Sequence, residues 1–192
     1  MKTKKFTTSQ LTILGLMAGI LFLMAYTPLG YLNIGPLAVT FNVIPVAVCA
    51  IVLGPTGGAI AGAVFGLTSF MQAIGIGGVS ALGSALFQIN PFMTAVQCFG
   101  PRILDGICIG FIYRAVHKKA NTYVSCAVTG FFSAFLNTLF FMTALIVMFG
   151  NTELIRNLMG GHNIIVGCCL MVGVNAISEM AVSYTHLRAH ET

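Results

Sequence analysis

The sequence predicts an all-α integral membrane protein with six transmembrane helices in one bundle and both termini in the cytoplasm. Three observations favour this fold class. Hydrophobic residues make up 57% of the 192 residues and charged residues only 7%, and the mean hydropathy of +0.96 lies far above that of soluble domains. The apolar residues form six segments of about 20 residues, the length that crosses a bilayer. Lys and Arg are also distributed unevenly between the two ends of these segments.

Polar residues and Gly- or Pro-rich stretches separate the six segments. The expected spans are residues 11–26, 39–53, 57–74, 91–116 (or from Pro101), 123–149 and 162–182. One side of the membrane then holds most cations: Lys2, Lys4, Lys5, Arg114, Lys118 and Lys119, against Arg102 and Arg156 on the other. Cation-rich loops stay in the cytoplasm. Both termini are therefore expected there, with residues 27–38, 75–90 and 150–161 as external loops.

The two ends of the chain differ in character. The start, MKTKKF, is not expected to be a cleavable secretory signal, because further spans follow the first apolar run. The last ten residues, SYTHLRAHET, are far more polar than the rest. We therefore expect one membrane domain at residues 1–182 and a non-native tail at residues 183–192, with a genuine polar tail as the alternative.

Charge and cysteine usage argue against several other classes of protein. The net charge of +5 comes from a few cations at segment ends, so lipid headgroups explain it better than nucleic acid does. The six cysteines lie in apolar segments without the spacing of metal ligands. They are expected to be small packing residues rather than disulfides or a metal site.

Small residues form stripes on two of the expected helices. Glycines recur every four residues in the third span, in GPTGGAIAGAVFG at residues 54–66, and the first span carries Gly15, Ala18 and Gly19. A face without side chains lets another backbone approach closely in the membrane. The third-span stripe therefore packs either against a helix of the same chain or against a partner protein. The face of the first span is open to the same two interpretations.

Three pieces of the sequence resemble a known family. They are LAVTFNVIPVAVCAIVLGPTGGAIAGAVFGLTS (residues 37–69), GPRILDGICIGFIYR (100–114) and VNAISE (174–179). The first is similar to the second and third helices of the substrate-binding S components of energy-coupling factor (ECF) vitamin transporters, with the greatest likeness to the pantothenate and folate group. The resemblance covers residues 8–182.

The resemblance implies a six-helix subunit of the bacterial plasma membrane that binds a vitamin from outside with high affinity. It also implies docking on a membrane coupling subunit driven by two ABC-type ATPases, with rigid-body reorientation when the ligand is delivered. Small-residue faces of such subunits contact the coupling subunit. The residues expected to dock the partner are Gly15, Ala18, Gly19, Gly58 and Gly62.

Arg102 is the foremost candidate for ligand binding. It follows Gly100-Pro101, a pair expected at a kink or helix start, which would place Arg102 near a helix N-terminus on the outer side. A cation there opposes the helix dipole, and a carboxylate from outside could compensate through two hydrogen bonds. The alternative is that Asp105, on the same helix face, pairs with Arg102 in a structural unit.

Uncharged polar residues suggest the rest of a pocket. Asn42 interrupts the second span, Gln72 ends the third, Gln97 precedes Arg102 and Asn137 lies inside the fifth. Amides both donate and accept, which suits a ligand with hydroxyl and amide groups. Hydrogen bonds between helices are the alternative for each of them.

Two expected external loops could close the pocket. Residues 27–38 and 75–90 combine glycines with apolar and aromatic residues, as a movable lid should. Tyr31 and Phe87 are the expected lid residues, and simple burial at the membrane interface is the alternative.

The sequence favours binding over catalysis. No glycine run ends in Gly-Lys-Ser or Gly-Lys-Thr, so a nucleotide-driven machine would have to be supplied by partners. We expect a vitamin-binding membrane subunit without a cofactor, with pantothenate as the first ligand and folate or another carboxylated vitamin next. A free-standing small-solute carrier is the main competitor and a membrane enzyme a weaker one.

Overall fold

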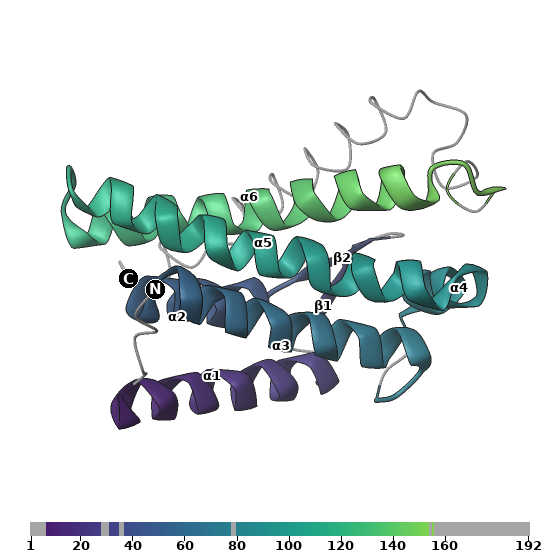
Figure 1. Ribbon diagram of the computed structural model, residues 1–192, viewed down its shortest axis with the longest axis horizontal. Coiled ribbons are helices and arrows are strands. Elements are labelled where there is room, and N and C mark those ends of the chain that lie inside the picture. Colours follow the sequence, from purple (N-terminus) through teal and green to yellow (C-terminus); the bar gives the residue numbers. More distant parts are fainter. Residues whose placement is uncertain (1–6, 28–30, 35–36, 78–79, 154, 156–192) are drawn as a thin grey trace, which may run out of the picture.

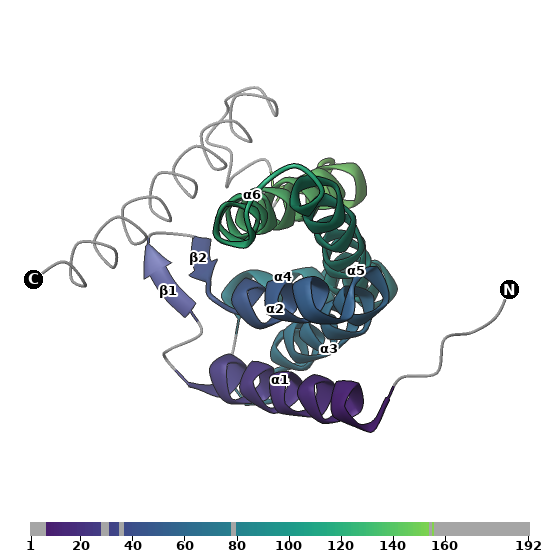
Figure 2. The same ribbon diagram turned by 90° about the vertical axis from the view of Figure 1, so that its left-hand side faces the viewer.

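Long helices that run back and forth along one direction dominate the computed structural model (Figure 1), which describes residues 7–27, 31–34, 37–77, 80–153 and 155. The elements are α1 (Thr8–Tyr26), β1 (Tyr31–Ile34), β2 (Leu37–Thr40), α2 (Val43–Leu53), α3 (Pro55–Ile74), α4 (Ala81–Ile89), α5 (Pro91–His117) and α6 (Thr122–Phe149). In Figures 1 and 2, α1 and α6 lie on opposite sides of a central group formed by α2, α3 and α5.

Among the described residues, four helices are long and apolar enough to cross a membrane: α1, α3, α5 and α6. They match the predicted spans 11–26, 57–74, 91–116 and 123–149, which confirms a helical fold of the membrane-spanning kind. α2 has only 11 residues, about 16 Å at 1.5 Å per residue, and is shorter than a bilayer core of about 30 Å. The predicted sixth span, 162–182, and the tail, 183–192, lie outside the described residues.

The all-helical prediction is confirmed for the bundle, and the structure adds one element that the sequence did not predict, an antiparallel hairpin formed by β1 and β2. The hairpin occupies most of the predicted first external loop and includes residues 39 and 40 of the predicted second span. That span therefore begins later, at Val43, with Asn42 immediately before it. Pairing the two strands gives hydrogen-bond partners to backbone N–H and C=O groups outside the helices. Such groups cost free energy when they remain unpaired near a membrane.

The second predicted external loop, 75–90, contains the short helix α4. Ser80 caps this helix by accepting a hydrogen bond from the Gly83 N–H at 3.2 Å, and Gly75 ends α3 with a φ of 95°, a left-handed conformation that suits glycine. α4 packs against both α3 and α5. The predicted loop therefore contains a capped helix that packs on the bundle, rather than only irregular backbone.

The glycine stripe of α3 packs against α5 within the same chain. A β-carbon added at Gly58 would overlap Gly106 O, one at Gly62 would overlap Arg102 O, and one at Gly66 would lie 2.9 Å from Cys98 O. The two helices are antiparallel and touch backbone to backbone at each turn. The prediction that Gly58 and Gly62 dock a partner is therefore wrong, because α5 already occupies their face.

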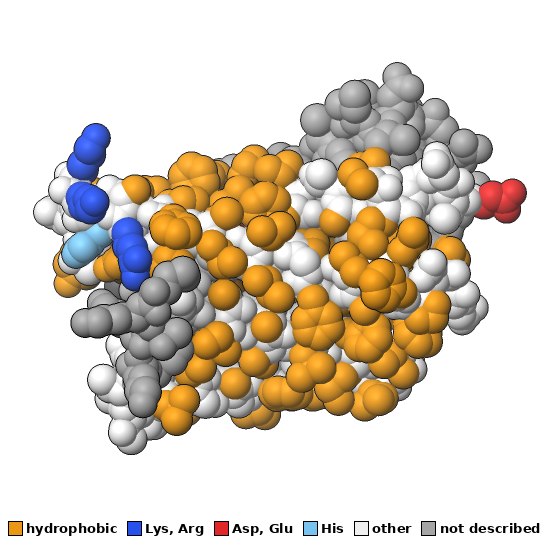
Figure 3. Space-filling view, viewed as in Figure 1, with side chains coloured by type: hydrophobic (Ala, Val, Ile, Leu, Met, Phe, Trp, Pro, Cys, Tyr) orange, Lys and Arg blue, Asp and Glu red, His pale blue; other side chains and the backbone are white. Residues whose placement is uncertain are grey.

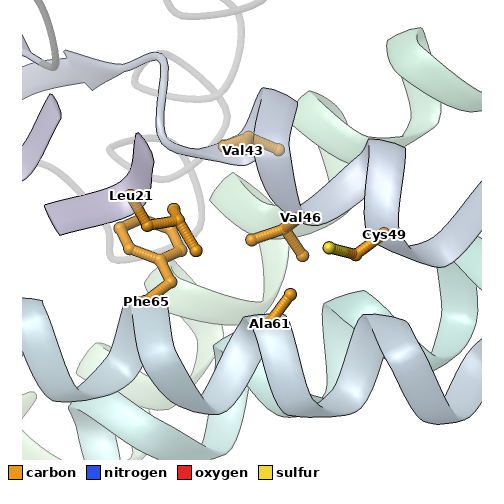
Figure 4. Packing of buried hydrophobic residues seen from close by; sticks show 6 residues of the cluster. All are labelled: Leu21, Val43, Val46, Cys49, Ala61 and Phe65. Atoms are coloured by element: carbon orange, nitrogen blue, oxygen red, sulfur yellow. The ribbon is translucent and has the colours of Figure 1, made fainter. Parts of the chain in front are cut away.

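The face of α1 differs from that stripe. A β-carbon at Gly15 or Gly19 would meet nothing within 4 Å, and both glycines are exposed while Ala18 is half-buried. The opposite side of α1 contributes Leu21 to a core cluster with residues of α2 and α3 (Figure 4). That cluster consists of Leu21, Val43, Val46, Cys49, Ala61 and Phe65.

Charged side chains gather at the two ends of the molecule (Figure 3). The Lys and Arg side chains visible on this face lie at the end where α5 finishes and α6 begins, and an acidic side chain lies at the opposite end. The surface between these ends is largely apolar, as Figure 3 shows. This distribution suits a molecule whose middle faces lipid and whose ends face water.

Candidate functional site

Arg102 lies in the interior of α5, eleven residues after the helix begins. Asn90 caps this helix by accepting hydrogen bonds from Phe92 N–H at 3.1 Å and Met93 N–H at 3.2 Å, and Pro91 occupies the first turn. Pro101 is therefore inside the helix and does not start it. The prediction that Arg102 sits near a helix N-terminus is wrong, because the cap at Asn90 sets the start more than two turns earlier.

The guanidinium of Arg102 is enclosed by aromatic rings. Its Cζ lies 4.4 Å from the ring centroid of Phe141 and 5.1 Å from that of Phe65, and Nη1 donates a hydrogen bond to Gln97 O at 3.3 Å. Only 9% of the residue is exposed. Both rings attract the cation, so Arg102 is held in place by α3 and α6 as well as by its own helix.

The glycine stripe makes this enclosure possible. Because Gly62 has no side chain, the backbone of α3 lies directly against the Arg102 carbonyl. Phe65 follows Gly62 by three residues, on nearly the same helix face, and so reaches the guanidinium. A larger residue at position 62 would hold α3 and its aromatic ring away from Arg102.

A hydrogen bond fixes the relative position of α5 and α6. Gln97 Nε2 donates to Phe141 O at 2.8 Å. Since the two helices are antiparallel with equal rise per residue, moving along α5 from Gln97 to Arg102 corresponds to moving back along α6 from Phe141 to about Asn137. By the same count, Asp105 lies level with Ser133.

This region forms a buried group that we call the α5–α6 polar cluster: Gln97, Arg102, Asp105, Ser133 and Asn137. Within the part of the chain that the structure describes, four of its oxygen atoms are buried without a hydrogen-bond partner, namely Gln97 Oε1, Asp105 Oδ1, Ser133 Oγ and Asn137 Oδ1. Buried oxygens of this kind are costly unless they receive a hydrogen bond. A ligand that brings N–H and O–H donors would satisfy them.

A structural pair between Asp105 and Arg102 is the second interpretation of this region, because Asp105 follows Arg102 by three residues on the same helix. Asp105 is 2% exposed, and its Oδ1 has no hydrogen-bond partner among the described residues. The contacts of Arg102 include the two aromatic rings and Gln97 O. Asp105 is therefore close to the cation in sequence while one of its oxygens is unused.

The other predicted site residues come from elements other than α5 and α6. Gln72 Nε2 donates to Ala25 O at 2.6 Å and so joins α3 to the end of α1, which is the helix-to-helix alternative. Asn42 is fully buried just before α2. Phe87 of α4 packs edge-on against Phe70, with ring centroids 6.0 Å apart. Tyr31 lies in β1, and its side chain is outside the described part.

Three members of the site were not singled out from the sequence as ligand-binding candidates: Phe65, Phe141 and Ser133. The sequence did contain a signal for Ser133. Small polar residues recur every four positions along the apolar α6, and all are buried: Ser125, Thr129, Ser133 and Asn137. Such spacing places them on one face of a helix, so the polar lining of α6 could have been found by its period.

The chemistry available to the cluster is hydrogen bonding and charge. No three His, Cys, Asp or Glu side chains among the described residues lie together in a way that could hold a metal ion. The four cysteines that the structure describes are free thiols: Cys49, Cys98, Cys108 and Cys126.

Comparison with known proteins connects this architecture to transport. Residues 9–186 match the family described as ECF transporter, substrate-specific component. The chain is 32% identical over 164 residues to the pantothenate transporter PanT of Leuconostoc mesenteroides, an alignment that covers 82% of this chain and 74% of that protein. It is 28% identical over 162 residues to the pantothenic acid transporter PanT of Lactococcus lactis, covering 78% of each. This chain therefore belongs to the family of substrate-specific components of ECF transporters, which are multi-pass proteins of the bacterial cell membrane.

Proposed function

We propose that this chain is the high-affinity pantothenate-binding subunit of an ECF-type importer. Two relatives at 28–32% identity are named as pantothenate transporters. The observation that carries the proposal is the α5–α6 polar cluster, in which a buried, ring-enclosed Arg102 lies among oxygens that need donors. Such an arrangement suits an anion that also carries N–H and O–H groups.

Pantothenate has this set of groups: one carboxylate, one secondary amide and two hydroxyls. We propose that Arg102 binds the carboxylate through its guanidinium fork. The amide N–H and the hydroxyls then donate to Gln97 Oε1 and Asn137 Oδ1. Folate or another carboxylated vitamin would use Arg102 in the same way and is the alternative ligand.

The membrane arrangement is part of the proposal. Six spans with both termini in the cytoplasm would place the end that carries Arg114, Lys118 and Lys119 inside the cell, as the distribution of cations favours. The ligand then enters from the end that carries α4 and the hairpin, where Phe87 and Tyr31 would act as lid residues. Residues 1–182 would form this unit, with the tail following it.

Partner docking is proposed for α1. Gly15, Ala18 and Gly19 give this helix a face that a neighbouring backbone could approach closely. A coupling subunit with two ABC-type ATPases would bind there and drive delivery.

Isothermal titration of the purified chain tests the ligand. We expect tight binding of pantothenate and much weaker binding of folate, thiamine, riboflavin and niacin. Loss of a charged hydrogen-bonding group costs about 1.5–3 kcal/mol, so Arg102→Ala should weaken pantothenate binding by roughly 10- to 150-fold. Arg102→Lys keeps the charge but loses the fork, and its affinity should fall between those of the other two proteins.

Arg114→Ala is the matched control, because Arg114 is an exposed arginine of the same helix. It should bind pantothenate with wild-type affinity. If Arg102→Ala bound as tightly as Arg114→Ala does, the carboxylate contact would be wrong. If folate were the tightest ligand of the panel, the first choice of vitamin would be wrong.

Reconstitution separates the importer subunit from a free-standing carrier. We expect liposomes with this chain alone to bind pantothenate without accumulating it, and uptake to require the coupling subunit and ATPases. Uptake by the chain alone would favour the carrier instead. Turnover of the ligand into a product would favour a membrane enzyme.

A further inference from the structure

Asp105 is a buried acid to which the proposed ligand contacts give no role. It lies inside α5 and is 2% exposed. The other acid that the structure describes, Glu153, is exposed beyond the end of α6. A carboxylate buried at membrane depth is expensive unless it is compensated, and such residues are functional candidates by default.

The position of Asp105 couples it to the ligand site. It follows Arg102 by three residues on the same helix, a spacing that puts β-carbons about 5–6 Å apart. Asp105 Oδ1 has no hydrogen-bond partner within the described part of the chain, and neither does Oγ of Ser133, which lies at the same height on α6. The carboxyl therefore lies beside the proposed binding cation and has hydrogen-bonding capacity to spare.

The net charge around Arg102 differs between the free and the ligand-bound protein. Without ligand, an ionised Asp105 and Arg102 sum to zero. A carboxylate ligand on Arg102 would add one uncompensated negative charge in a low-dielectric interior, where a buried carboxylate neutralises by binding a proton. The group that can take up this proton is Asp105.

Other titratable side chains near α5 do not offer the same chemistry. α3 and α4 contain none, and α2 contributes only Cys49. Besides Asp105, the described titratable or charged groups of α5 and α6 are Cys98, Arg102, Cys108, Tyr113, Arg114, His117, Tyr123 and Cys126. Asp105 is thus the one carboxyl on the described helices that pack against α5 and on α5 itself.

We propose that this protein binds its anionic vitamin together with one proton, and that Asp105 takes up that proton. The inference rests on the proposed function, because it requires a carboxylate ligand at Arg102. In the step, one O–H bond of a solvent hydronium ion breaks and leaves a water molecule, and its proton forms an O–H bond with a carboxylate oxygen of Asp105 as the ligand carboxylate engages Arg102; no oxidation state changes. The vitamin and the proton would then travel to the other side of the membrane as a pair of zero net charge.

The sign of the pH dependence follows from linkage. If binding takes up one proton, raising the pH opposes binding, and affinity falls by about tenfold per pH unit where the free protein has Asp105 ionised. At lower pH, where Asp105 is already protonated before binding, the affinity becomes independent of pH.

Calorimetry of the full chain measures the proton directly. Pantothenate is titrated between about pH 5.5 and 8.5 in buffers of different ionisation enthalpy, and the dependence of the observed heat on the buffer gives the number of protons taken up. We expect about one proton per pantothenate in the upper part of this range. The matched ligand is the alcohol analogue, in which –CH2OH replaces the carboxylate; because it is uncharged, it should bind without proton uptake.

Two variants assign the proton to a residue. Asp105→Asn mimics the protonated acid, so its pantothenate affinity should no longer vary with pH and its proton uptake should vanish. Glu153→Gln is the control and should take up the same number of protons as the wild type. If Asp105→Asn still takes up the proton, the assignment to Asp105 is wrong.

The outcomes separate this inference from the proposed function. If pantothenate does not bind at all, both are wrong. If pantothenate binds but the wild type takes up no proton at any pH, the proposed proton uptake is wrong, whereas the proposed pantothenate binding is still supported. Equal proton uptake with pantothenate and with its alcohol analogue would also overturn it, and this comparison needs no variant to fold.

Discussion

The packing of α3 on α5 predicts that a methyl group added at Gly62 will leave the protein less stable than a methyl group added at Gly15. A β-carbon there would overlap Arg102 O and lie 2.9 Å from Arg102 C and 3.2 Å from the Ile103 Cα. These obstacles are backbone atoms, so no side-chain rotation can relieve the overlap and the two helices must move apart. Overpacking of this kind costs about 1–3 kcal/mol.

Gly15→Ala provides the matched comparison. Alanine is favoured over glycine by about 1 kcal/mol in any helix interior, so both variants gain this amount. A β-carbon at Gly15 meets nothing within 4 Å. The difference between Gly62→Ala and Gly15→Ala therefore isolates the overlap with α5, about 1–3 kcal/mol.

Thermal unfolding of the purified proteins measures this difference. For a chain of this size, each kcal/mol shifts the midpoint by about 2–4 °C, so Gly62→Ala should melt roughly 4–8 °C below Gly15→Ala for a cost near 2 kcal/mol. Pantothenate affinity should fall with it, because Phe65 moves away from Arg102. Melting of both variants within about a degree of each other would refute the backbone-to-backbone contact.

Three further predictions follow from individual contacts. Gln72→Met removes the bond to Ala25 O and should cost about 1–2 kcal/mol of stability while leaving the pantothenate Kd unchanged; a tenfold weaker Kd in titration would return Gln72 to the ligand site. Asn90→Ala removes the cap of α5 and should cost about 1 kcal/mol, and an unchanged melting temperature would contradict the capping role. Gly15→Leu and Gly19→Leu should leave binding intact but abolish uptake with the ATPases, and full uptake would argue against docking on this face.

The apolar composition and span lengths were enough to predict the long helices. A helix in lipid must satisfy its own backbone and expose apolar side chains, so α1, α3, α5 and α6 could be located from the chain alone. The Lys and Arg at the end of α5 likewise predicted one charged end. These features depend on local sequence and on the solvent, and not on which helix packs beside which.

Contacts between distant residues could not be obtained in this way. The glycine stripe predicted a close approach but not its partner, since Gly58 and Gly62 would suit any smooth surface equally well. Only the packed structure shows that α5 fills it. The same holds for Arg102. The aromatic rings that enclose it belong to Phe65, 37 residues before it, and Phe141, 39 residues after it.

The start of the fourth predicted span was left open between two residues by the sequence. Pro101 and Pro91 can each begin a helix, and the cap at Asn90, together with packing of α5 on α3, α4 and α6, decides for Pro91. That choice moves Arg102 to the middle of a long helix, beside Asp105 and among the polar residues of α6. The sequence by itself determined which groups are available for a carboxylated ligand, and the tertiary structure decided which of them meet, because burial and charge depend on neighbours that the order of residues does not specify.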